Sequence, residues 1–190
     1  MKPKTFTIIF IIISILFISF LPRLRYGREN SFENNRDRND KFRSVLDNTL
    51  KNYPCIPSPE NYEVGVVSQV IDGDSIRVII DGQEFEVRYI GIDAPEMTGE
   101  DQTAGRESKA ANQLLVEGKE VVLFRDVSQT DQFGRLLRYV LVESVFVNYQ
   151  MVLDGHAIAK SYPPDIACQN YFNEAKYSDL EEFSDNEYFK

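Results

Sequence analysis

Short apolar runs rich in Val and Ile alternate with polar turns through the middle of the chain. Five such runs lie at about residues 62–71, 74–80, 84–92, 120–127 and 134–142. Runs of this length, bounded by Gly, Asp and Ser, predict β-strands. The Asp81-Gly82 pair between the second and third runs favours a two-residue hairpin turn, because Gly readily adopts the positive φ angle that this turn needs. The first three strands are therefore predicted to form a meander.

Helical patterns separate and follow these strands. Residues 104–116 are rich in helix formers and stop at Gly118, and near-helical spacing predicts an apolar face made of Ala111, Leu114 and Leu115. A short helix is predicted from an Asn148 cap to Gly155, and a third covers about 166–180. This order, βββ-α-ββ-α, matches the partly open, five-stranded Greek-key barrel of the OB-fold, an α+β protein that is mainly β barrel with about three helices.

A long uncharged run at residues 6–21 precedes the domain and has basic residues on both sides. It is slightly short for a membrane-spanning helix and long for the apolar part of a secretory signal. Because Phe20, Leu21 and Pro22 stand where a cleavage site would have small residues, we favour an uncleaved anchor over a cleaved signal. A buried core helix is less favoured, and the balanced flanking charge leaves the orientation open.

Composition divides the chain into four parts. Residues 1–25 form the anchor or signal segment. Residues 26–60 are polar and end in a proline-rich stretch, which predicts a flexible tether with room for a short helix near 43–50. The folded domain is expected over residues 61–180, and an acidic tail follows at 181–190.

The net charge of −9 is spread unevenly. Residues 60–170 carry 9 basic and 19 acidic side chains, whereas residues 1–59 carry 10 basic and 5 acidic ones. So acidic a domain is a poor non-specific ligand of nucleic acid, because that binding depends on Lys and Arg facing phosphates. Any phosphate chemistry must therefore be arranged locally.

The two cysteines of the chain, Cys55 and Cys168, flank the acidic segment. A disulfide between them and two unrelated buried thiols fit the sequence equally well. An export signal would permit the disulfide, and closing so long a loop would contribute about 4 kcal/mol in the chain-entropy model. Their separation excludes a zinc knuckle.

Three acidic side chains stand at strand ends or turns: Asp74 in VIDGDS, and Asp93 and Glu96 in IDAPE. Pairing the second and third strands around the hairpin places Asp74 nearly opposite residues 89–91, so the carboxylates can converge. Oxygen ligands without His or Cys suit Ca²⁺ or Mg²⁺, and the pattern predicts a calcium site. Ordinary turn acids are the alternative, and this interpretation fits Asp72 well.

Arg88 interrupts an apolar strand and Arg135 opens another, and a buried arginine needs a partner. Each could neutralise a nearby carboxylate or offer a planar fork of donors to a phosphate oxygen. A cation and two arginines around a carboxylate suit phosphodiester hydrolysis. Strict strand alternation puts Arg88 and Asp93 on opposite faces, so Gly91 must bend or bulge the strand if they are to meet.

Three motifs, VIDGDS, VRYIGIDAPE and TDQFGRLLRYV, occur in this order with a helix between the last two. Over about residues 61–180 the chain resembles the staphylococcal nuclease family. The resemblance implies an OB-fold barrel with three helices that hydrolyses DNA and RNA with Ca²⁺ and leaves 3′-phosphate ends. It also implies the Ca²⁺ ligands, which are the carboxylates of Asp74 and Asp93 and the main-chain carbonyl of Ala94.

The same resemblance implies roles in catalysis and substrate binding. Glu96 corresponds to the carboxylate that acts on the attacking water, and Arg88 and Arg135 correspond to the phosphate-binding arginines. Tyr162 lies near the position of an aromatic residue that stacks on the nucleotide. The loop after Glu96 is shorter and more acidic than in the best-known member, and a Lys-Tyr pair before Arg135 is replaced by Gln-Phe, so we expect weak substrate binding.

The sequence therefore favours a monomeric, calcium-dependent nuclease acting on DNA or RNA outside the cytoplasm. The protein would be membrane-anchored through residues 6–21 if that segment is uncleaved, and secreted otherwise. The alternatives are a non-catalytic OB-type binding module and an envelope interaction protein whose nuclease fold is incidental. The binding module is less favoured because the chain retains its charged motif residues, Asp74, Arg88, Glu96 and Arg135.

Overall fold

A computed structural model describes residues 42–57, 61–98 and 102–175. The chain forms two compact units, Met1–Val45 and Leu46–Lys190. The described part of the first unit is residues 42–45, which begin a helix at 42–52. The second unit contains the barrel.

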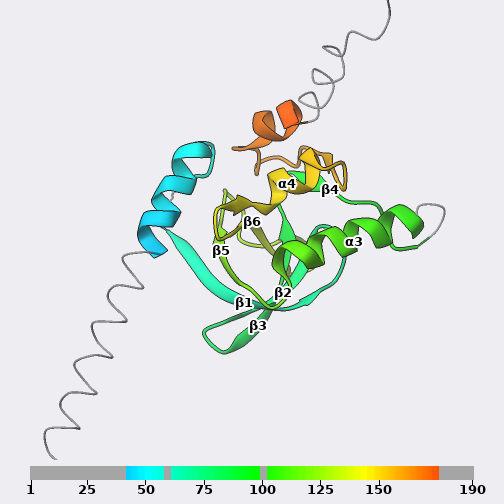
Figure 1. The fold of residues 1–190 in the computed structure, drawn as a ribbon, viewed down its shortest axis with the longest axis horizontal. Helices are drawn as coiled ribbons and strands as arrows, with labels where there is room; N and C mark the ends of the chain where they lie inside the picture. The colour runs from blue at the N-terminus through cyan, green and yellow to red at the C-terminus, as the bar shows by residue number, and fades with distance from the viewer. Residues whose placement is uncertain (1–41, 58–60, 99–101, 176–190) are drawn as a thin grey trace, which may run out of the picture. The chain divides into compact units, whose positions relative to one another are not determined.

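Five strands form a closed barrel (Figure 1): β1 (Tyr62–Val70), β2 (Ser75–Ile80), β3 (Gln83–Tyr89), β5 (Glu120–Phe124) and β6 (Leu136–Val142). They pair antiparallel in the order β3-β2-β1-β5-β6, and a parallel pairing of β3 with β6 closes the sheet. A short strand, β7 (Val145–Phe146), extends the sheet beside β6. The predicted five-stranded OB-type barrel is confirmed.

The third strand is shorter than the sequence predicted. β3 ends at Tyr89 rather than at residue 92, because Gly91 has a φ angle of +80° that breaks the strand. The next two residues form β4 (Ile92–Asp93), which pairs antiparallel with β8 (Ile158–Ala159) in a separate two-stranded sheet. The end of the VRYIGIDAPE motif is therefore held by a segment far away in the sequence.

The predicted hairpin between β2 and β3 is confirmed. Asp81 and Gly82 have φ angles of +50° and +81°, as a two-residue turn with positive φ at both positions requires. The Tyr89 amide donates to the Asp74 carbonyl over 2.8 Å, so Asp74 lies opposite the start of the predicted range 89–91. The hairpin thus carries the first predicted metal ligand to the end of β3.

Two helices pack on the barrel and on each other, α3 (Gln102–Val116) against β1 and α4 (Val147–Leu153) against β6. The predicted apolar face of α3 is wrong, because Leu114 is 82% exposed. The buried positions of α3 are mostly small or polar, namely Gly105, Ser108, Asn112 and Val116. The sheet side of this helix is therefore built for close approach and hydrogen bonding.

The predicted Asn148 cap is also wrong. The helix α4 begins after Phe146, and Asn148 is buried within its first turn. The Asn148 amide accepts from the Val140 amide over 2.9 Å and donates to the Ile90 carbonyl over 2.9 Å. Asn148 ties β6 to the turn after β3 because both main-chain groups are buried there and need partners. The glycine stop at Gly155, with φ of +73°, is as predicted.

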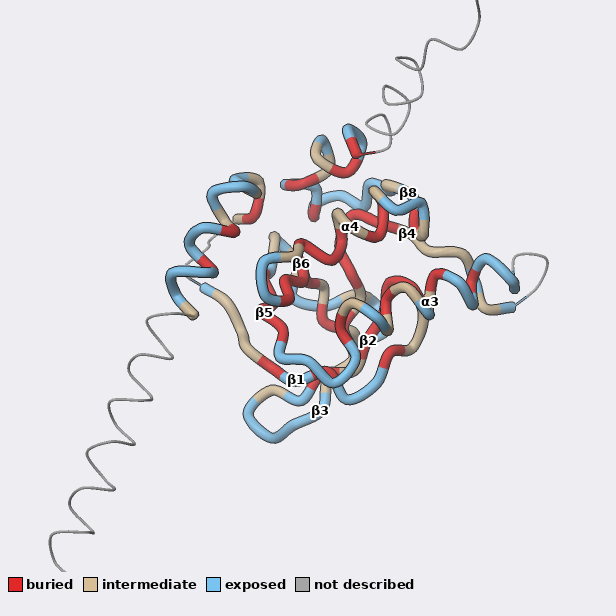
Figure 2. The backbone as a smooth tube through the Cα atoms, in the orientation of Figure 1, coloured by how far each residue is buried: buried red, intermediate tan, exposed pale blue. Residues whose placement is uncertain are grey.

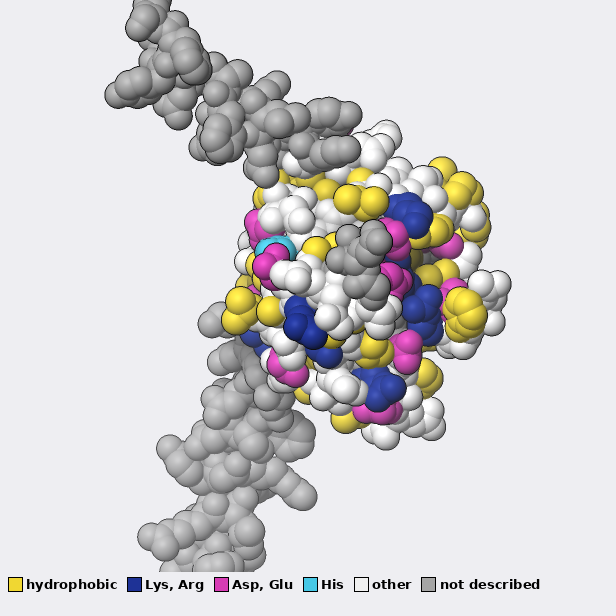
Figure 3. Space-filling model, turned by 90° about the vertical axis from the view of Figure 1, so that its right-hand side faces the viewer, with side chains coloured by type: hydrophobic (Ala, Val, Ile, Leu, Met, Phe, Trp, Pro, Cys, Tyr) yellow, Lys and Arg dark blue, Asp and Glu magenta, His cyan; other side chains and the backbone are white. Residues whose placement is uncertain are grey.

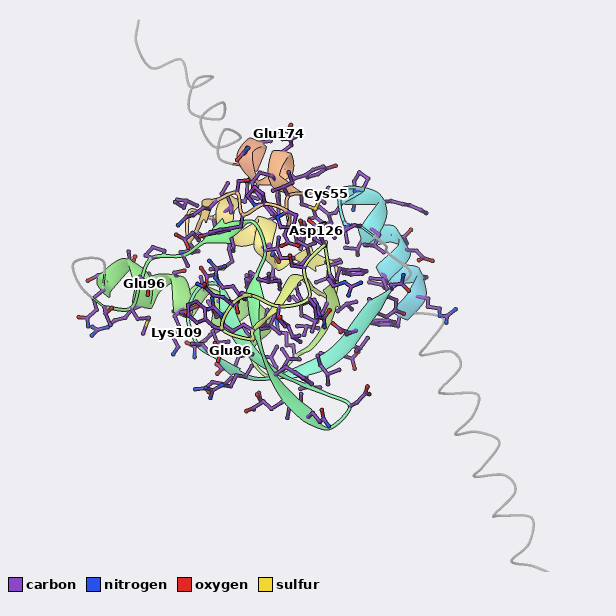
Figure 4. All side chains as sticks on the ribbon, turned by 180° about the vertical axis from the view of Figure 1, so that it is seen from behind. Cys55, Glu86, Glu96, Lys109, Asp126 and Glu174 are labelled. Carbon is purple, nitrogen blue, oxygen red and sulfur yellow. A yellow bond between two sulfur atoms is a disulfide. The ribbon has the colours of Figure 1, made fainter. Side chains whose placement is uncertain are left out.

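The segments before and after the barrel are joined covalently. Cys55 and Cys168 form a disulfide, and Cys55 lies beside the C-terminal segment in Figure 4. The rings of Tyr53 and Phe146 pack edge to face with their centres 5.1 Å apart. Buried residues concentrate in β5, β6 and α4 (Figure 2), and residues 46–57 of the predicted tether add to this core through Leu46 and Ile56.

Some predicted segments lie outside the described residues. These are the anchor or signal at residues 6–21 and the acidic tail at 181–190. The third predicted helix is described as helical residues 169–175. Within residues 42–57, 61–98 and 102–175, no helix is long and apolar enough to cross a membrane.

Candidate functional site

A cavity of about 480 Å³ opens where the ends of β3 and β4 meet the loop before β6. Every residue that the sequence proposed for metal, catalysis or substrate binding lines it: Asp74, Arg88, Asp93, Ala94, Glu96, Arg135 and Tyr162. On the face drawn in Figure 3, acidic side chains lie directly beside lysine and arginine side chains. The fold therefore gathers a site of mixed charge from distant segments.

Arg88 joins the two predicted metal-binding carboxylates. Its Nη2 atom lies 3.1 Å from Asp74 Oδ2 and 3.0 Å from Asp93 Oδ1. Its Nη1 atom donates to the Tyr89 carbonyl over 2.7 Å. With 11% of its side chain exposed, the guanidinium is held inside the cavity wall by three oxygen atoms. One arginine thus links the strand before the bend to the carboxylate after it.

Gly91 makes this link possible. Its positive φ angle lets Asp93 turn to the side of Arg88, which removes the conflict that strict alternation predicts. A Cβ atom at this position would also collide with the ring of Phe172 from helical residues 169–175. Both the backbone conformation and the packing therefore require glycine here.

Asp74 is buried, with 8% of its side chain exposed. Its Oδ2 accepts the Ala94 amide over 2.7 Å, and its Oδ1 accepts the Ser75 hydroxyl over 3.1 Å. Burial raises the pKa of Asp74 to about 6, a rise that Arg88 opposes and the neighbouring Asp72 carboxylate increases. The raised pKa means that the charge of Asp74 is incompletely compensated, so an added cation would favour its ionised form.

Helix α3 braces the turn that carries Asp74. The Asn112 amide donates to the Asp72 carbonyl over 2.9 Å and accepts the Tyr89 hydroxyl over 2.9 Å. Gly73 allows this approach, since a Cβ atom there would collide with Ser108 of α3. The Asp72 carboxylate accepts the Asp74 amide, which closes a local turn. Asp72 is therefore a turn acid, as its local sequence suggested, and it also lines the cavity.

Arg135 is oriented by its own loop. Its Nε donates to Asp131 Oδ2 over 2.7 Å, and Asp131 Oδ1 accepts the main-chain amides of Phe133 and Arg135. Burial would raise the pKa of Asp131, but these hydrogen bonds hold it below its usual value. The guanidinium also lies 5.5 Å from the centre of the Phe133 ring, which is 74% exposed. Arg135 therefore reaches the cavity in a fixed orientation.

Glu96 lies on the loop between β4 and α3, as Figure 4 shows. Its side chain is exposed and lines the cavity, and no described residue forms a hydrogen bond or ion pair with its carboxylate. The loop itself is packed closely, because a Cβ atom on Gly105 of α3 would collide with the Glu96 carbonyl. The main chain is thus placed by packing, while the carboxylate stays accessible to water.

Asp93 has two further partners at the rim of the cavity. Its Oδ2 accepts the Lys160 ammonium over 2.7 Å, and its Oδ1 accepts the Tyr162 hydroxyl over 3.2 Å. The hydrogen bond that the ammonium donates to Asp93 raises the pKa of Lys160. The ammonium also lies 5.4 Å from the centre of the Tyr162 ring, which the structure places at the cavity as the sequence proposed.

The donor set of the cavity fits a hard divalent cation. Among the described residues, no group of three or more His, Cys, Asp or Glu side chains has the arrangement of a metal centre. The carboxylates of Asp74 and Asp93 nevertheless converge on one atom of Arg88, and Ala94 lines the same cavity. Oxygen donors of this kind suit Ca²⁺ or Mg²⁺, with water completing the shell. The incompletely compensated charge of Asp74 is consistent with a cation in this cavity.

Together, the fold and the site define a class: OB-type barrels that carry carboxylates and arginines in a cavity at their strand ends. The comparisons with known proteins agree. The chain matches the family described as staphylococcal nuclease homologue over residues 86–182. It is 36% identical over 103 residues to a thermonuclease of Staphylococcus intermedius, covering 53% of this chain and 61% of that protein.

Two other relatives extend the match. A thermonuclease of Staphylococcus hyicus is 32% identical over 122 residues, which cover 63% of this chain and 72% of that protein. Endonuclease YncB of Bacillus subtilis (strain 168) is 32% identical over 124 residues, which cover 63% of this chain and 57% of that protein. The chain belongs to the staphylococcal nuclease family.

Three residues of the site were not found from the sequence. Asp131 had a signal, because it stands four residues before Arg135 and carries the opposite charge. Asn112 had a weaker signal as a polar residue within a helical segment. Lys160 had none, because it lies 67 residues from Asp93 and meets it only through the pairing of β4 with β8.

Proposed function

We propose that this protein is a calcium-dependent nuclease that hydrolyses phosphodiester bonds of DNA or RNA. The observation that carries the proposal is the position of Arg88, which joins Asp74 and Asp93 within one cavity. Glu96 and Arg135 line the same cavity. Membership in the nuclease family and the endonuclease name of one relative support this activity.

The Asp74 and Asp93 carboxylates and the Ala94 carbonyl would hold Ca²⁺. When bound, the cation would supply positive charge that stabilises the developing charge on the phosphate. The chain itself supplies the remaining groups. Arg88 and Arg135 offer planar N–H donors to phosphate oxygens, and each is already oriented by a carboxylate. Such preorganised donors need little rearrangement as charge builds up in the transition state.

Glu96 is suited to act on the attacking water. Its carboxylate is exposed to solvent within the cavity and is not engaged by any described residue. A carboxylate in this situation can accept a proton from water or orient it, either of which typically contributes about 10²–10⁴-fold to a rate. By contrast, Asp74, Asp93 and Asp131 in the same cavity are each bound to an arginine.

The acidic surface sets the expected strength of substrate binding. Residues 60–170 carry 9 basic and 19 acidic side chains, so long-range attraction to a polyanion is weak. Attraction is confined to the part of the cavity nearest Arg88, Arg135 and the cation, because six carboxylates line the same cavity, those of Asp72, Asp74, Asp93, Glu96, Asp131 and Asp165. Binding should therefore be weak and sensitive to salt, with release between cuts.

We further propose an extracytoplasmic location, either anchored through residues 6–21 or secreted, and a monomeric state. The uncharged run at residues 6–21 and the disulfide between Cys55 and Cys168 support export, because such disulfides persist in oxidising compartments. Millimolar calcium outside cells would fill a weak site with a dissociation constant of about 10⁻⁴–10⁻³ M. Fractionation of cells into medium and membranes tests the location.

Cleavage assays test the activity. Purified full-length protein is incubated with single-stranded DNA and, separately, RNA, with Ca²⁺ or with EDTA. We expect cleavage with Ca²⁺ but not with EDTA, and products with 3′-phosphate ends. In Glu96→Gln the cleavage rate should fall by about 10²–10⁴-fold. Glu107→Gln is the matched control, because Glu107 is exposed on α3 and makes the same charge change away from the cavity.

The alternative is a binding module without catalysis. That alternative would be favoured if the wild type cleaved DNA no faster than Glu96→Gln, if EDTA did not change either rate, and if the wild type still bound DNA.

A further inference from the structure

Both carboxylate oxygens of Asp93 are occupied by side chains of the protein. Oδ1 accepts from Arg88 over 3.0 Å and from Tyr162 over 3.2 Å. Oδ2 accepts from Lys160 over 2.7 Å, the shortest of the three bonds. A cation that uses Asp93 as a ligand must therefore share or replace one of these donors.

The register of the small sheet fixes Lys160 in this place. β4 and β8 pair Asp93 with Ile158, and the Lys160 amide donates to the Gly91 carbonyl over 2.9 Å. Lys160 follows Ile158 by two residues, so its side chain lies on the same face as Asp93 and diagonally across from it. The long side chain then spans the diagonal to the carboxylate. The contact follows from main-chain pairing and does not depend on a chance surface rotamer.

Lys160 is the donor that can leave. Its side chain is 47% exposed, whereas that of Arg88 is 11% exposed. Arg88 is also bound by Asp74 and by a main-chain carbonyl, so moving it would break several interactions. A single exposed ion pair is worth only about 0–1 kcal/mol and is easily exchanged. The two cations on Asp93 therefore differ sharply in how firmly they are held.

We propose that Lys160 is a built-in counter-cation of Asp93 that exchanges with the divalent metal and then binds the substrate phosphate. This inference rests on the proposed function. Lys160 and Arg88 together compensate the charge of Asp93. A divalent cation held by Asp93 would repel the ammonium and so release it from the carboxylate.

Once released from Asp93, the Lys160 ammonium would lie close enough to the cavity to bind a substrate phosphate. The Lys160 ammonium lies 5.4 Å from the ring centre of Tyr162, which lines the cavity, so the reach of its side chain includes the cavity mouth. A phosphodiester bound in the cavity would place an anion within reach of that position. Lys160 would become a third basic contact beside Arg88 and Arg135, in a domain poor in other lysines near the site. Metal and phosphate would then each strengthen the binding of the other.

Calorimetry of the full-length protein tests the exchange with two probes. The first titration uses CaCl₂ alone, and the second uses a nucleoside 5′-monophosphate at saturating Ca²⁺. Lys160→Met should bind Ca²⁺ roughly two- to fivefold more tightly than the wild type, because a competing charge is gone. It should bind the nucleotide roughly two- to fivefold more weakly, and Lys160→Arg should restore that affinity.

Tighter Ca²⁺ binding together with weaker nucleotide binding distinguishes this role from a structural one, because a variant with a damaged site would bind both probes more weakly. Lys119→Met is the matched control, since Lys119 is exposed and lies away from the cavity, and it should change neither affinity. Equal Ca²⁺ affinities in the wild type and Lys160→Met would overturn the exchange and leave the calcium site standing. Absence of Ca²⁺ binding in both proteins would overturn the calcium site and the exchange together.

Discussion

Arg88 and Asp93 form an ion pair of 3.0 Å across a bend that Gly91 makes between them. The pair connects the barrel strand β3 to the short strand β4, and its geometry depends on a backbone angle that other residues rarely adopt. The site can therefore be perturbed from a position that contributes no side chain to it.

Gly91→Ala should reduce both stability and activity. The positive φ angle costs about 1 kcal/mol for a residue with a Cβ atom, and the collision with Phe172 adds about 1–3 kcal/mol. Gly82→Ala is the matched control, because Gly82 has a similar φ of +81° and open space around it. In urea unfolding, the free energy of unfolding should fall by about 1 kcal/mol in Gly82→Ala and by about 2–4 kcal/mol in Gly91→Ala. Equal losses and equal activities would contradict the role given to Gly91.

Arg88→Gln should destabilise the metal-free protein by about 2–4 kcal/mol, because two nearby carboxylates lose their shared, largely buried partner. Calcium should recover part of this loss, so the Ca²⁺-induced rise in melting temperature should exceed that of the wild type. Thermal unfolding with EDTA and with Ca²⁺ measures both effects. Arg106→Gln, which removes an exposed charge on α3, should behave as the wild type. A smaller calcium response in Arg88→Gln would argue against metal binding by these carboxylates.

Asp131→Asn should slow cleavage by about tenfold or more, because Arg135 loses the partner that fixes its orientation. The effect should fall mainly on kcat, since the charge of Arg135 remains available for binding. Steady-state kinetics on a short oligonucleotide separate kcat from KM. Asp154→Asn removes an exposed acid that bonds Gln150 away from the cavity, and it should leave both parameters unchanged. A rise confined to KM would contradict the orienting role.

The metal-free protein should become less stable as pH rises from about 4 to 6. The pKa of Asp74 is raised from its ordinary value of 3.8 to about 6, so in this window the native state holds a proton that the unfolded state has released. The stability that this proton provides is fully present below pH 3.8, the ordinary pKa of Asp74. It is lost as the pH rises through about 6, the pKa of Asp74 in the folded protein. The shift corresponds to about 1–3 kcal/mol. Urea unfolding in EDTA at several pH values, compared with Asp74→Asn, isolates this contribution. Identical pH profiles of the two proteins would contradict it.

Replacing Cys55 and Cys168 together by serine should lower the free energy of unfolding by about 2–5 kcal/mol, because the disulfide closes a loop with a sequence separation of 113. Cys168 precedes the helical segment whose Phe172 packs against Gly91, so activity should fall as well. Unfolding of the double variant and of the wild type with and without reductant measures the effect. An unchanged unfolding midpoint on reduction would contradict it.

Much of the site could be read from local sequence. The Asp81-Gly82 turn sets the register of β2 and β3, and that register carries Asp74 to the end of β3. Turn chemistry of this kind acts over a few residues, so the sequence contains it directly. The face of α3 could not be read in the same way, because a buried serine and asparagine replace the apolar stripe where the helix braces the turn of Asp72. Tertiary hydrogen bonding overrode the apolar pattern there.

The sequence by itself determined the barrel, the hairpin and the charged residues that share the cavity. The tertiary structure decided how those charges meet. Gly91 turns Asp93 toward Arg88, and the pairing of β4 with β8 brings Lys160 to the same carboxylate. The reason is physical: turn preferences depend on neighbouring residues, whereas the pairing of segments 67 residues apart depends on how the whole core packs.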